Sequence, residues 1–206
     1  MHARLGLFGR YTTPTGVVQA GLTAVTPLVS DTTPAVDQVL TAKPGTWGPA
    51  GAGVTFGYQW YKGSTAITGA TASTYRVRSS DVGSTIKVKV TGRAADYANV
   101  SKTTAATSVV VKASFTTKPV PMITCAATCS FTVGETLTVA VGDWKPTPDG
   151  FTYQWYRTGT AISGATKAGY TLTSSDKGKT ITVTVTAKKA GYNNAAKTSV
   201  ASKPVA

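Results

Sequence analysis

Acidic side chains are scarce in this 206-residue sequence, and histidine is almost missing. There are eight Asp and Glu residues and one histidine, His2. The only glutamate is Glu135, so no glutamate pair is available for general acid–base catalysis. A Ser/His/Asp or Cys/His arrangement needs a histidine beside the nucleophile. The single histidine, His2, lies in the N-terminal arm, outside the repeated segments. We therefore expect no enzymatic activity and no catalytic residue.

The sequence also lacks the motifs that hold phosphates, metal ions and membranes. No G-x-x-x-x-G-K-[ST] or G-x-G-x-x-G loop occurs. The aspartates outside the repeated corners are scattered and do not follow a calcium-loop pattern. No stretch approaches the roughly 18 apolar residues of a membrane-spanning helix. We expect no cofactor, no metal site and no membrane span.

The dominant positive feature is an internal repeat. "YQWYKGSTAITGAT" at 58–71 returns as "YQWYRTGTAISGAT" at 153–166. Further matches follow at the same spacing, among them "IKVKVT" (86–91) with "ITVTVT" (181–186). Self-similarity of this kind indicates a duplicated structural unit. We predict an N-terminal arm at 1–18 and two domains at 19–111 and 112–206, each long enough to bury its own core.

Each copy has the pattern of an antiparallel β-sheet protein. Ile181, Val183 and Val185 alternate with threonines, and 86–90 alternates in the same way in the first copy. Alternation with period two predicts strands with one buried face. Glycine-containing turn signals recur at short intervals, and no helical periodicity persists. The sequence therefore predicts an all-β fold with two β-sandwiches.

The residues W…YQWYR.G..I.GAT…Y.L..SD.GK.ITV.VT…GY resemble the immunoglobulin-like repeat of surface and secreted proteins of Gram-positive bacteria and of virion proteins of tailed phages. The resemblance covers both copies. It implies tandem immunoglobulin-like antiparallel β-sandwiches used for spacing, adhesion or display, with Trp60 and Trp155 as the core tryptophan of the third strand. "SD.G" resembles the corner before the sixth strand. The paired core cysteines of antibody domains are missing, so apolar packing must replace them.

The repeated aromatic residues have two interpretations. Aromatics at matching positions in both copies are expected in the core or at corners, where their burial stabilises a small sandwich. The alternative is a platform on which sugars stack.

The two cysteines, Cys125 and Cys129, also leave a choice. They lie in about three extra residues of the second copy; a zinc site would need four ligands, so we expect a local disulfide, with two free thiols as the alternative.

Positive charge is in excess throughout, with 21 Lys and Arg residues and a formal net charge of +13. Two predicted strands of the first copy carry outward cations: Arg76 and Arg78, then Lys87 and Lys89. In the immunoglobulin topology these strands belong to different sheets, so the cations flank opposite faces. They are candidate contacts to an anionic surface. The alternative is a solvated strand protected from edge pairing. Nucleic acid is not the expected partner, because no aromatic residues interleave with the cations.

The arm offers apolar anchors with cations between them: Arg4, Leu5, Leu7, Phe8, Arg10 and Tyr11. Its apolar run "LGLFG" is too short for a signal-peptide core. Either an engineered start replaced a signal, or the protein leaves the cell by lysis, as virion proteins do. We predict a non-enzymatic virion protein, above all a capsid decoration protein. Its arm would dock on the major capsid protein or another virion component at the virion surface. The alternative is a secreted or wall-associated adhesion module, with a host-surface glycan as a candidate ligand.

Overall fold

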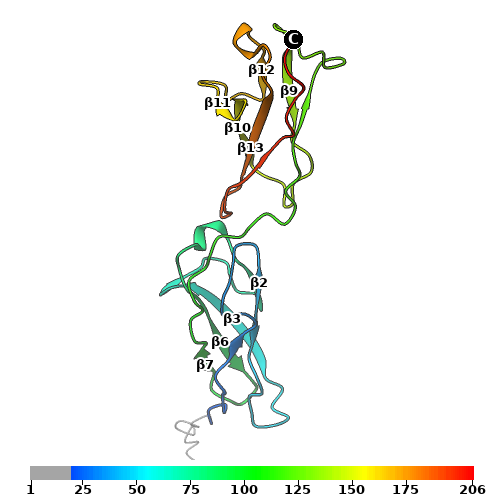
Figure 1. Cartoon of the computed structure of the whole chain (residues 1–206). Helices are drawn as coiled ribbons and strands as arrows, with labels where there is room; N and C mark the ends of the chain where they lie inside the picture. Colours follow the sequence, from blue (N-terminus) through cyan, green and yellow to red (C-terminus); the bar gives the residue numbers. More distant parts are fainter. Residues whose placement is uncertain (1–19) are drawn as a thin grey trace, which may run out of the picture. The chain divides into compact units, whose positions relative to one another are not determined.

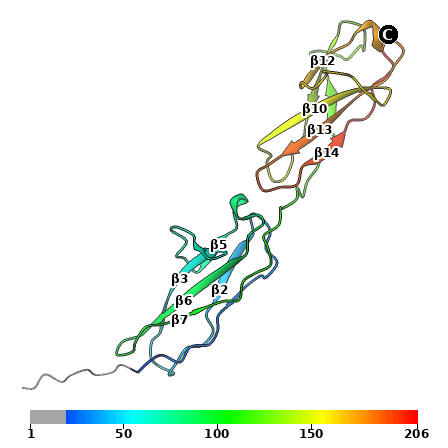
Figure 2. The ribbon, with the colours of Figure 1, turned by 90° about the vertical axis from the view of Figure 1, so that its left-hand side faces the viewer.

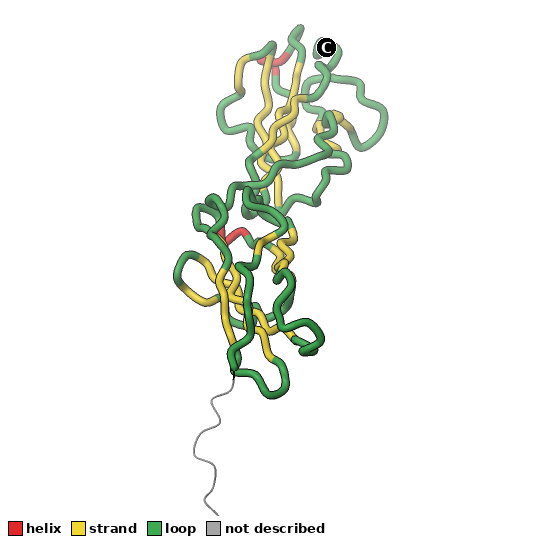
Figure 3. The backbone as a smooth tube through the Cα atoms, turned by 90° about the horizontal axis from the view of Figure 1, so that it is seen from below, coloured by secondary structure: helices red, strands yellow, loops and turns green. Residues whose placement is uncertain are grey.

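The computed structural model describes residues 20–206, and the predicted arm at 1–18 lies outside the described residues. The described chain consists of short strands joined by turns, with two 3-10 helices (Figure 3). The strands form two three-stranded and two four-stranded sheets. Every strand pair for which the register is known is antiparallel. The predicted all-β class with tandem immunoglobulin-like sandwiches is confirmed.

The first seven strands build the N-terminal sandwich (Figures 1 and 2). They are β1 (Leu28–Val29), β2 (Val39–Lys43), β3 (Thr55–Lys62), β4 (Thr65–Ala66), β5 (Thr74–Arg76), β6 (Ile86–Arg93) and β7 (Val100–Thr103), with the 3-10 helix η1 (Ser79–Asp81) between β5 and β6. One sheet has the order β1-β2-β5 and the other β4-β3-β6-β7.

The last seven strands build the C-terminal sandwich in the same order. They are β8 (Met122–Thr124), β9 (Thr136–Ala140), β10 (Gly150–Arg157), β11 (Thr160–Ala161), β12 (Gly169–Thr171), β13 (Ile181–Lys188) and β14 (Ala195–Thr198), with η2 (Ser174–Asp176) between β12 and β13. The sheets are β12-β9-β8 and β11-β10-β13-β14. The fourth strand of each sandwich therefore joins the larger sheet, whereas antibody constant domains place it on the other one.

The alternating sequence of β13 produces a two-faced strand. Ile181, Val183 and Val185 are fully buried, while the threonines between them are only half-buried on the opposite face. Val183 pairs with Trp155 of β10, and Val185 pairs with Tyr153. This register brings the apolar side chains of both strands to one face of the sheet, because side chains alternate along a strand.

The core tryptophans are buried, as the repeat predicts. Trp155 is 0% exposed and packs with Leu137, Leu172 and Ile181. Its indole N–H donates to the carbonyl of Lys167 at 2.9 Å, so the ring is buried without losing its hydrogen bond. Trp60 is equally buried, and its indole donates to Ala72 at 2.9 Å.

Trp47 and Trp144 are buried as well, so no tryptophan is available as a sugar-stacking platform. Their indoles donate to the carbonyls of Pro44 and Val141, each at 2.9 Å. The interpretation of the repeated tryptophans as core residues is confirmed.

The predicted domain boundaries stay a prediction. Backbone contacts divide the chain into one compact unit that includes 41–74 and 87–105 and a second that includes 31–40, 75–86 and 106–206. This division does not follow the boundaries at 19 and 112. The sandwiches are therefore described below by their strands.

Candidate functional site

The cations of the N-terminal sandwich lie on two different sheets. Arg76 belongs to β5 in the sheet β1-β2-β5, whereas Lys87 and Lys89 belong to β6 in the sheet β4-β3-β6-β7. Arg78, which we expected on the same strand as Arg76, lies beyond the end of β5 and caps η1 instead. The strand ends early because the backbone turns there into the 3-10 helix.

Each arginine has an interaction within the sandwich. Arg76 forms an ion pair with Asp37, with 3.0 Å between Nη2 and Oδ1, and 67% of its side chain is exposed. Arg78 lies over the ring of Tyr75, with 5.8 Å from Cζ to the ring centre. An exposed ion pair contributes little to stability, because water and salt screen it. Both guanidinium groups already have a partner within the sandwich, so they are less available than Lys87 and Lys89 to an external anion.

Lys87 and Lys89 face away from the core. They alternate along β6 with Ile86, Val88 and Val90, which are all 0% exposed. Since alternate side chains of a strand point to opposite faces, both lysines project from the outer face of the larger sheet. This face therefore presents two like charges, two residues apart along β6.

The C-terminal sandwich has threonine at the same places. Thr182 and Thr184 of β13 stand where Lys87 and Lys89 stand in β6. The hydroxyl of Thr184 is hydrogen-bonded to that of Thr198 on β14 at 2.8 Å. Two further hydroxyl pairs lie on the smaller sheet, Thr124 with Thr138 and Thr136 with Thr171. The two sandwiches thus share strand order but differ in charge at these two outward positions.

Cys125 and Cys129 are joined by a disulfide with a Cα–Cα distance of 5.3 Å. The bridge closes the loop that follows β8. Glu135 holds the residues that follow Cys129. Its carboxylate accepts hydrogen bonds from the backbone N–H groups of Ser130 at 3.3 Å and Thr132 at 3.2 Å. The hydroxyl of Ser130 donates to it as well, at 3.0 Å. Burial acts to raise the pKa of Glu135, but these hydrogen bonds together outweigh it, so the pKa lies below its ordinary value.

The only cysteines and the only glutamate of the chain therefore lie together. Both sulfurs and a carboxylate oxygen of Glu135 are within 4.8 Å of one another. The sequence pattern did not place Glu135 beside the cysteines, and the structure does. Zinc binds cysteine as the thiolate, whereas here both sulfurs are used by the disulfide and the carboxylate by the loop. With the cysteines oxidised, the disulfide and Glu135 therefore hold the loop in place and do not form a metal site.

Each sandwich has a buried aspartate at the corner before its sixth strand, Asp81 in the N-terminal one and Asp176 in the C-terminal one. The carboxylate of Asp176 accepts hydrogen bonds from Tyr170 at 2.8 Å, from the backbone N–H of Thr173 at 2.7 Å and from Nε of Arg157 at 2.6 Å. Asp81 accepts from Tyr75 at 2.6 Å in the N-terminal sandwich. The resemblance implies a corner at these aspartates, and in the structure each is hydrogen-bonded there to a tyrosine.

The corner changes the acidity of its members. Burial acts to raise the pKa of Asp176, but the hydrogen bonds from Arg157, Thr173 and Tyr170 outweigh it, so the pKa lies below its ordinary value. Burial and the neighbouring carboxylate raise the pKa of Tyr170. A carboxylate held in its charged form by fixed donors acts as a structural clamp, with no free oxygen for proton transfer.

The predicted docking residues of the arm, from Arg4 to Tyr11, lie outside the described residues. Within 20–206, no helix has the length and apolar character needed to cross a lipid bilayer.

Comparison with known proteins gives distant structural likenesses, three of which follow. No protein-family model matches the chain, and no curated protein resembles it in sequence. Murine CEACAM1b is 14% identical over 86% of this chain and 97% of that one, with a TM-score of 0.34. The D1–D4 ectodomain fragment of ICAM-5 is 15% identical over 86% of this chain and 51% of that one, with a TM-score of 0.35. The tandem Ig repeats of Dlar are 12% identical over 88% of this chain and 95% of that one, with a TM-score of 0.24. The immunoglobulin-like fold rests on the strand order of the chain itself, and such domains commonly serve in adhesion or display.

Proposed function

We propose that this chain is a non-enzymatic structural protein of a phage virion, and specifically a capsid decoration protein. The arm at 1–18 docks on the major capsid protein or another virion component, and the immunoglobulin-like sandwiches are displayed at the virion surface. The boundaries at 19–111 and 112–206 are part of this proposal, since each sandwich needs its own segment.

The observation that carries the proposal is the difference in charge at two matched outward positions of β6 and β13. Lys87 and Lys89 project from β6, whereas Thr182 and Thr184 occupy the same places on β13. The strand order does not require lysine there, because the C-terminal sandwich forms without it. The cations also belong to the sandwich that follows the cationic arm in sequence. This supports attachment to an anionic lattice through the arm and the N-terminal sandwich.

Co-sedimentation with purified particles of the phage that encodes the chain tests the proposal. We compare the full chain, a chain lacking residues 1–18, and Lys87→Ala/Lys89→Ala. The matched control is Lys177→Ala/Lys179→Ala, which removes the same charge from exposed positions of the C-terminal sandwich. Deletion of the arm is expected to abolish binding while both sandwiches stay folded.

The lysine pair and its control give different expected results. Lys87→Ala/Lys89→Ala should weaken binding and reduce its dependence on salt, since fewer charges are then screened. The control pair should bind as the full chain does. Undiminished binding without the arm would disprove arm docking and would shift attachment to the cationic strand residues.

The alternative is a secreted or wall-associated adhesion module, which the outward-facing hydroxyl groups of the C-terminal sandwich favour. Thr184 and Thr198 present paired hydroxyls at an exposed sheet surface, and hydroxyl groups can bind a glycan through hydrogen bonds. Cell-wall sacculi of a Gram-positive bacterium replace the particles in the same assay. Binding to sacculi together with no binding to particles would establish this alternative.

A further inference from the structure

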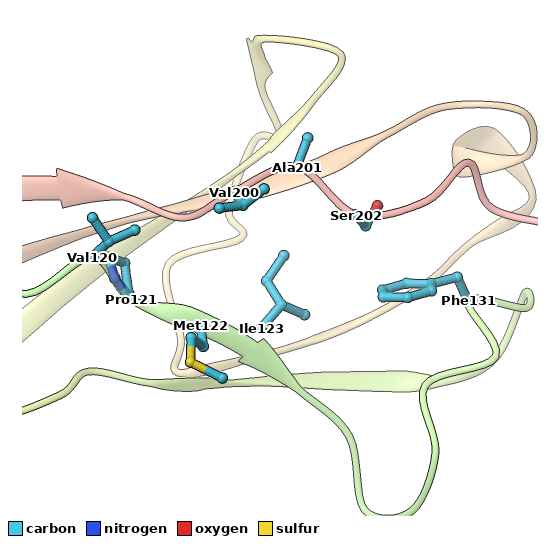
Figure 4. Close-up of a pocket in the computed structure, with 8 residues that line it drawn as sticks. All are labelled: Val120, Pro121, Met122, Ile123, Phe131, Val200, Ala201 and Ser202. Carbon is cyan, nitrogen blue, oxygen red and sulfur yellow. The ribbon is translucent and has the colours of Figure 1, made fainter.

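The C-terminal sandwich has an open apolar groove along the edge strand β8 (Figure 4). Its volume is about 450 Å³. One wall is formed by 120–123, which leads into β8, and the other by 200–202, which follows β14. Phe131 lines the groove beyond Ile123, on the side toward Ser202 (Figure 4). The whole site lies within one sandwich and is separate from the cationic strands discussed above.

The groove exposes large apolar side chains on both walls. Val120 is 53% exposed and Met122 is 66% exposed on one wall, and Val200 is 79% exposed on the other. Single exposed apolar residues are ordinary, but a contiguous set around a groove indicates a binding surface. An occupant that covered these side chains would remove their apolar surface from water.

The first wall offers backbone hydrogen-bonding groups as well as side chains. β8 is the outer strand of the sheet β12-β9-β8, and Met122 and Ile123 pair with Ala140 and Val139 of β9. Among residues 20–206, no strand pairs with the other edge of β8. An extended peptide can add to such an edge as a further strand, with main-chain hydrogen bonds for affinity and alternate side chains for specificity. Pro121 lacks an N–H donor, so the added strand would pair mainly along 122–124.

The second wall is fixed in position. The backbone N–H of Ser199 donates to Val183 and that of Ser202 donates to Ile181, each at 2.9 Å. The hydroxyl of Ser199 accepts from the N–H of Val183 at 3.0 Å. Val200 and Ala201 are therefore held between two anchored residues. A preformed wall lowers the ordering cost of binding.

The charge around the groove selects the kind of peptide. Lys118 lies two residues before Val120, and Lys203 follows Ser202; both are exposed. Neither 118–123 nor 199–203 contains an acidic residue. The nearest acid in sequence to Phe131 is Glu135, whose oxygens accept hydrogen bonds from Ser130 and Thr132. An apolar groove with a lysine next to each wall in sequence is complementary to acidic residues that flank an apolar strand.

We propose that this groove binds an extended peptide segment that carries apolar side chains at alternating positions and acidic residues at its ends. The segment adds to β8 as a strand, places its apolar side chains between Met122 and Val200, and brings its acidic ends to Lys118 and Lys203. The site is independent of attachment through the arm. It would give the C-terminal sandwich a ligand of its own.

Fluorescence anisotropy with the full chain tests the proposal. The probe is a labelled peptide in which three valines alternate with two threonines between pairs of aspartates. One control peptide has the same composition with the three valines adjacent, and another has lysines in place of the aspartates. The acidic alternating peptide should bind saturably, and each control at least tenfold more weakly. Equal binding of the three peptides would overturn the proposal.

Two variants locate the site. Val200→Asp should weaken binding of the acidic peptide at least tenfold, because it removes an apolar contact and repels the aspartates. The matched control is Leu28→Asp, since Leu28 is 63% exposed and occupies the position of Met122 in the N-terminal sandwich. It should change the affinity less than twofold. Equal losses in both variants would place the binding elsewhere and refute the groove.

A surface variant keeps the test decisive if Val200→Asp does not fold. Lys118→Glu/Lys203→Glu changes only exposed side chains, and it should reverse the preference from the acidic to the lysine-flanked peptide. An unchanged preference would overturn the role of these lysines and with it the proposal. A peptide with the sequence of residues 3–11 of this chain gives one more outcome. If it binds more tightly than the acidic peptide, the occupant is the arm of a second copy and the acidic partner is wrong.

Discussion

Replacing Asp176 by asparagine should destabilise the C-terminal sandwich by about 3 kcal/mol. The aspartate is 0% exposed. Besides Tyr170, Arg157 and the backbone of Thr173, the hydroxyl of Thr173 also donates to it, at 2.9 Å. Asparagine has nearly the same size, so the change removes the charge and one acceptor without opening a cavity. Its NH2 group would then face a donor.

The magnitude follows from what the substitution leaves unpaired. A hydrogen bond to a charged group contributes about 1.5–3 kcal/mol, and loss of one partner of a buried ion pair costs about 3–5 kcal/mol. The side chain of Arg157 is 29% exposed, so water can solvate part of the guanidinium group after the change. The expected cost therefore lies near the lower end of the range for a buried pair.

Hydrogen exchange measured by mass spectrometry separates the two sandwiches in the full chain. With Asp176→Asn, peptides from β10 and β13 should lose protection, while peptides from β3 and β6 should keep it. Urea unfolding gives the free energy. Asp149→Asn is the matched control, because Asp149 is an exposed carboxylate that pairs with Lys189 at 3.4 Å. A change below about 1 kcal/mol for Asp176→Asn, the size expected of an exposed pair, would refute the reasoning.

The stabilisation that Asp176→Asn removes should depend on pH in a predictable direction. The folded pKa of Asp176 is lowered, so its stabilisation is present above the unfolded value of about 3.9 and is lost as the pH falls toward the folded value. The stability difference between the parent chain and Asp176→Asn should be largest near neutral pH and should shrink below about pH 4. A difference that does not change with pH would mean that the charge of Asp176 is not what stabilises the corner.

Three further outcomes are expected. Trp155→Ala should cost about 3–5 kcal/mol in urea unfolding, because it empties a fully buried core position; a cost under about 1 kcal/mol would contradict the core assignment. The intact mass should rise by two hydrogens on reduction if Cys125 and Cys129 are bonded in solution. Cys125→Ser/Cys129→Ser should lower stability by about 2 kcal/mol, the entropy of closing so short a loop, and an unchanged urea midpoint would show that the bridge adds nothing.

Much of the fold could be predicted because its determinants are local and repeated. The alternation at 181–186 specifies a two-faced strand regardless of its neighbours, and Ile181, Val183 and Val185 are indeed fully buried. Trp60 and Trp155 recur at matching positions, which favours the core over a surface role. The spacing of Tyr75 to Asp81 equals that of Tyr170 to Asp176, so the corner pairs were also visible as a repeated pattern.

The remaining features depend on segments that are distant in sequence. Arg157 reaches Asp176 from the larger sheet, and nothing in the residues around either one indicates that contact. Met122 and Val200 share a groove only because the first and last strands of a sandwich lie on neighbouring edges. Glu135 follows Cys129 closely, yet its place beside the disulfide depends on the turn between them. Such contacts appear only when the chain has folded.

The protein is basic because only eight Asp and Glu residues stand against 21 lysines and arginines. Of the eight Asp and Glu residues, Asp31 binds the backbone of Thr33, Asp149 binds that of Ala190, and Glu135 closes the disulfide loop. Asp81 and Asp176 are buried in their corners. Most carboxylates are therefore held by hydrogen bonds within the fold, and eight negative charges leave a net charge of +13. A polyanion that approaches this protein meets little internal competition for its cations, so adding a few surface glutamates should reduce its retention on a cation-exchange resin without loosening the fold.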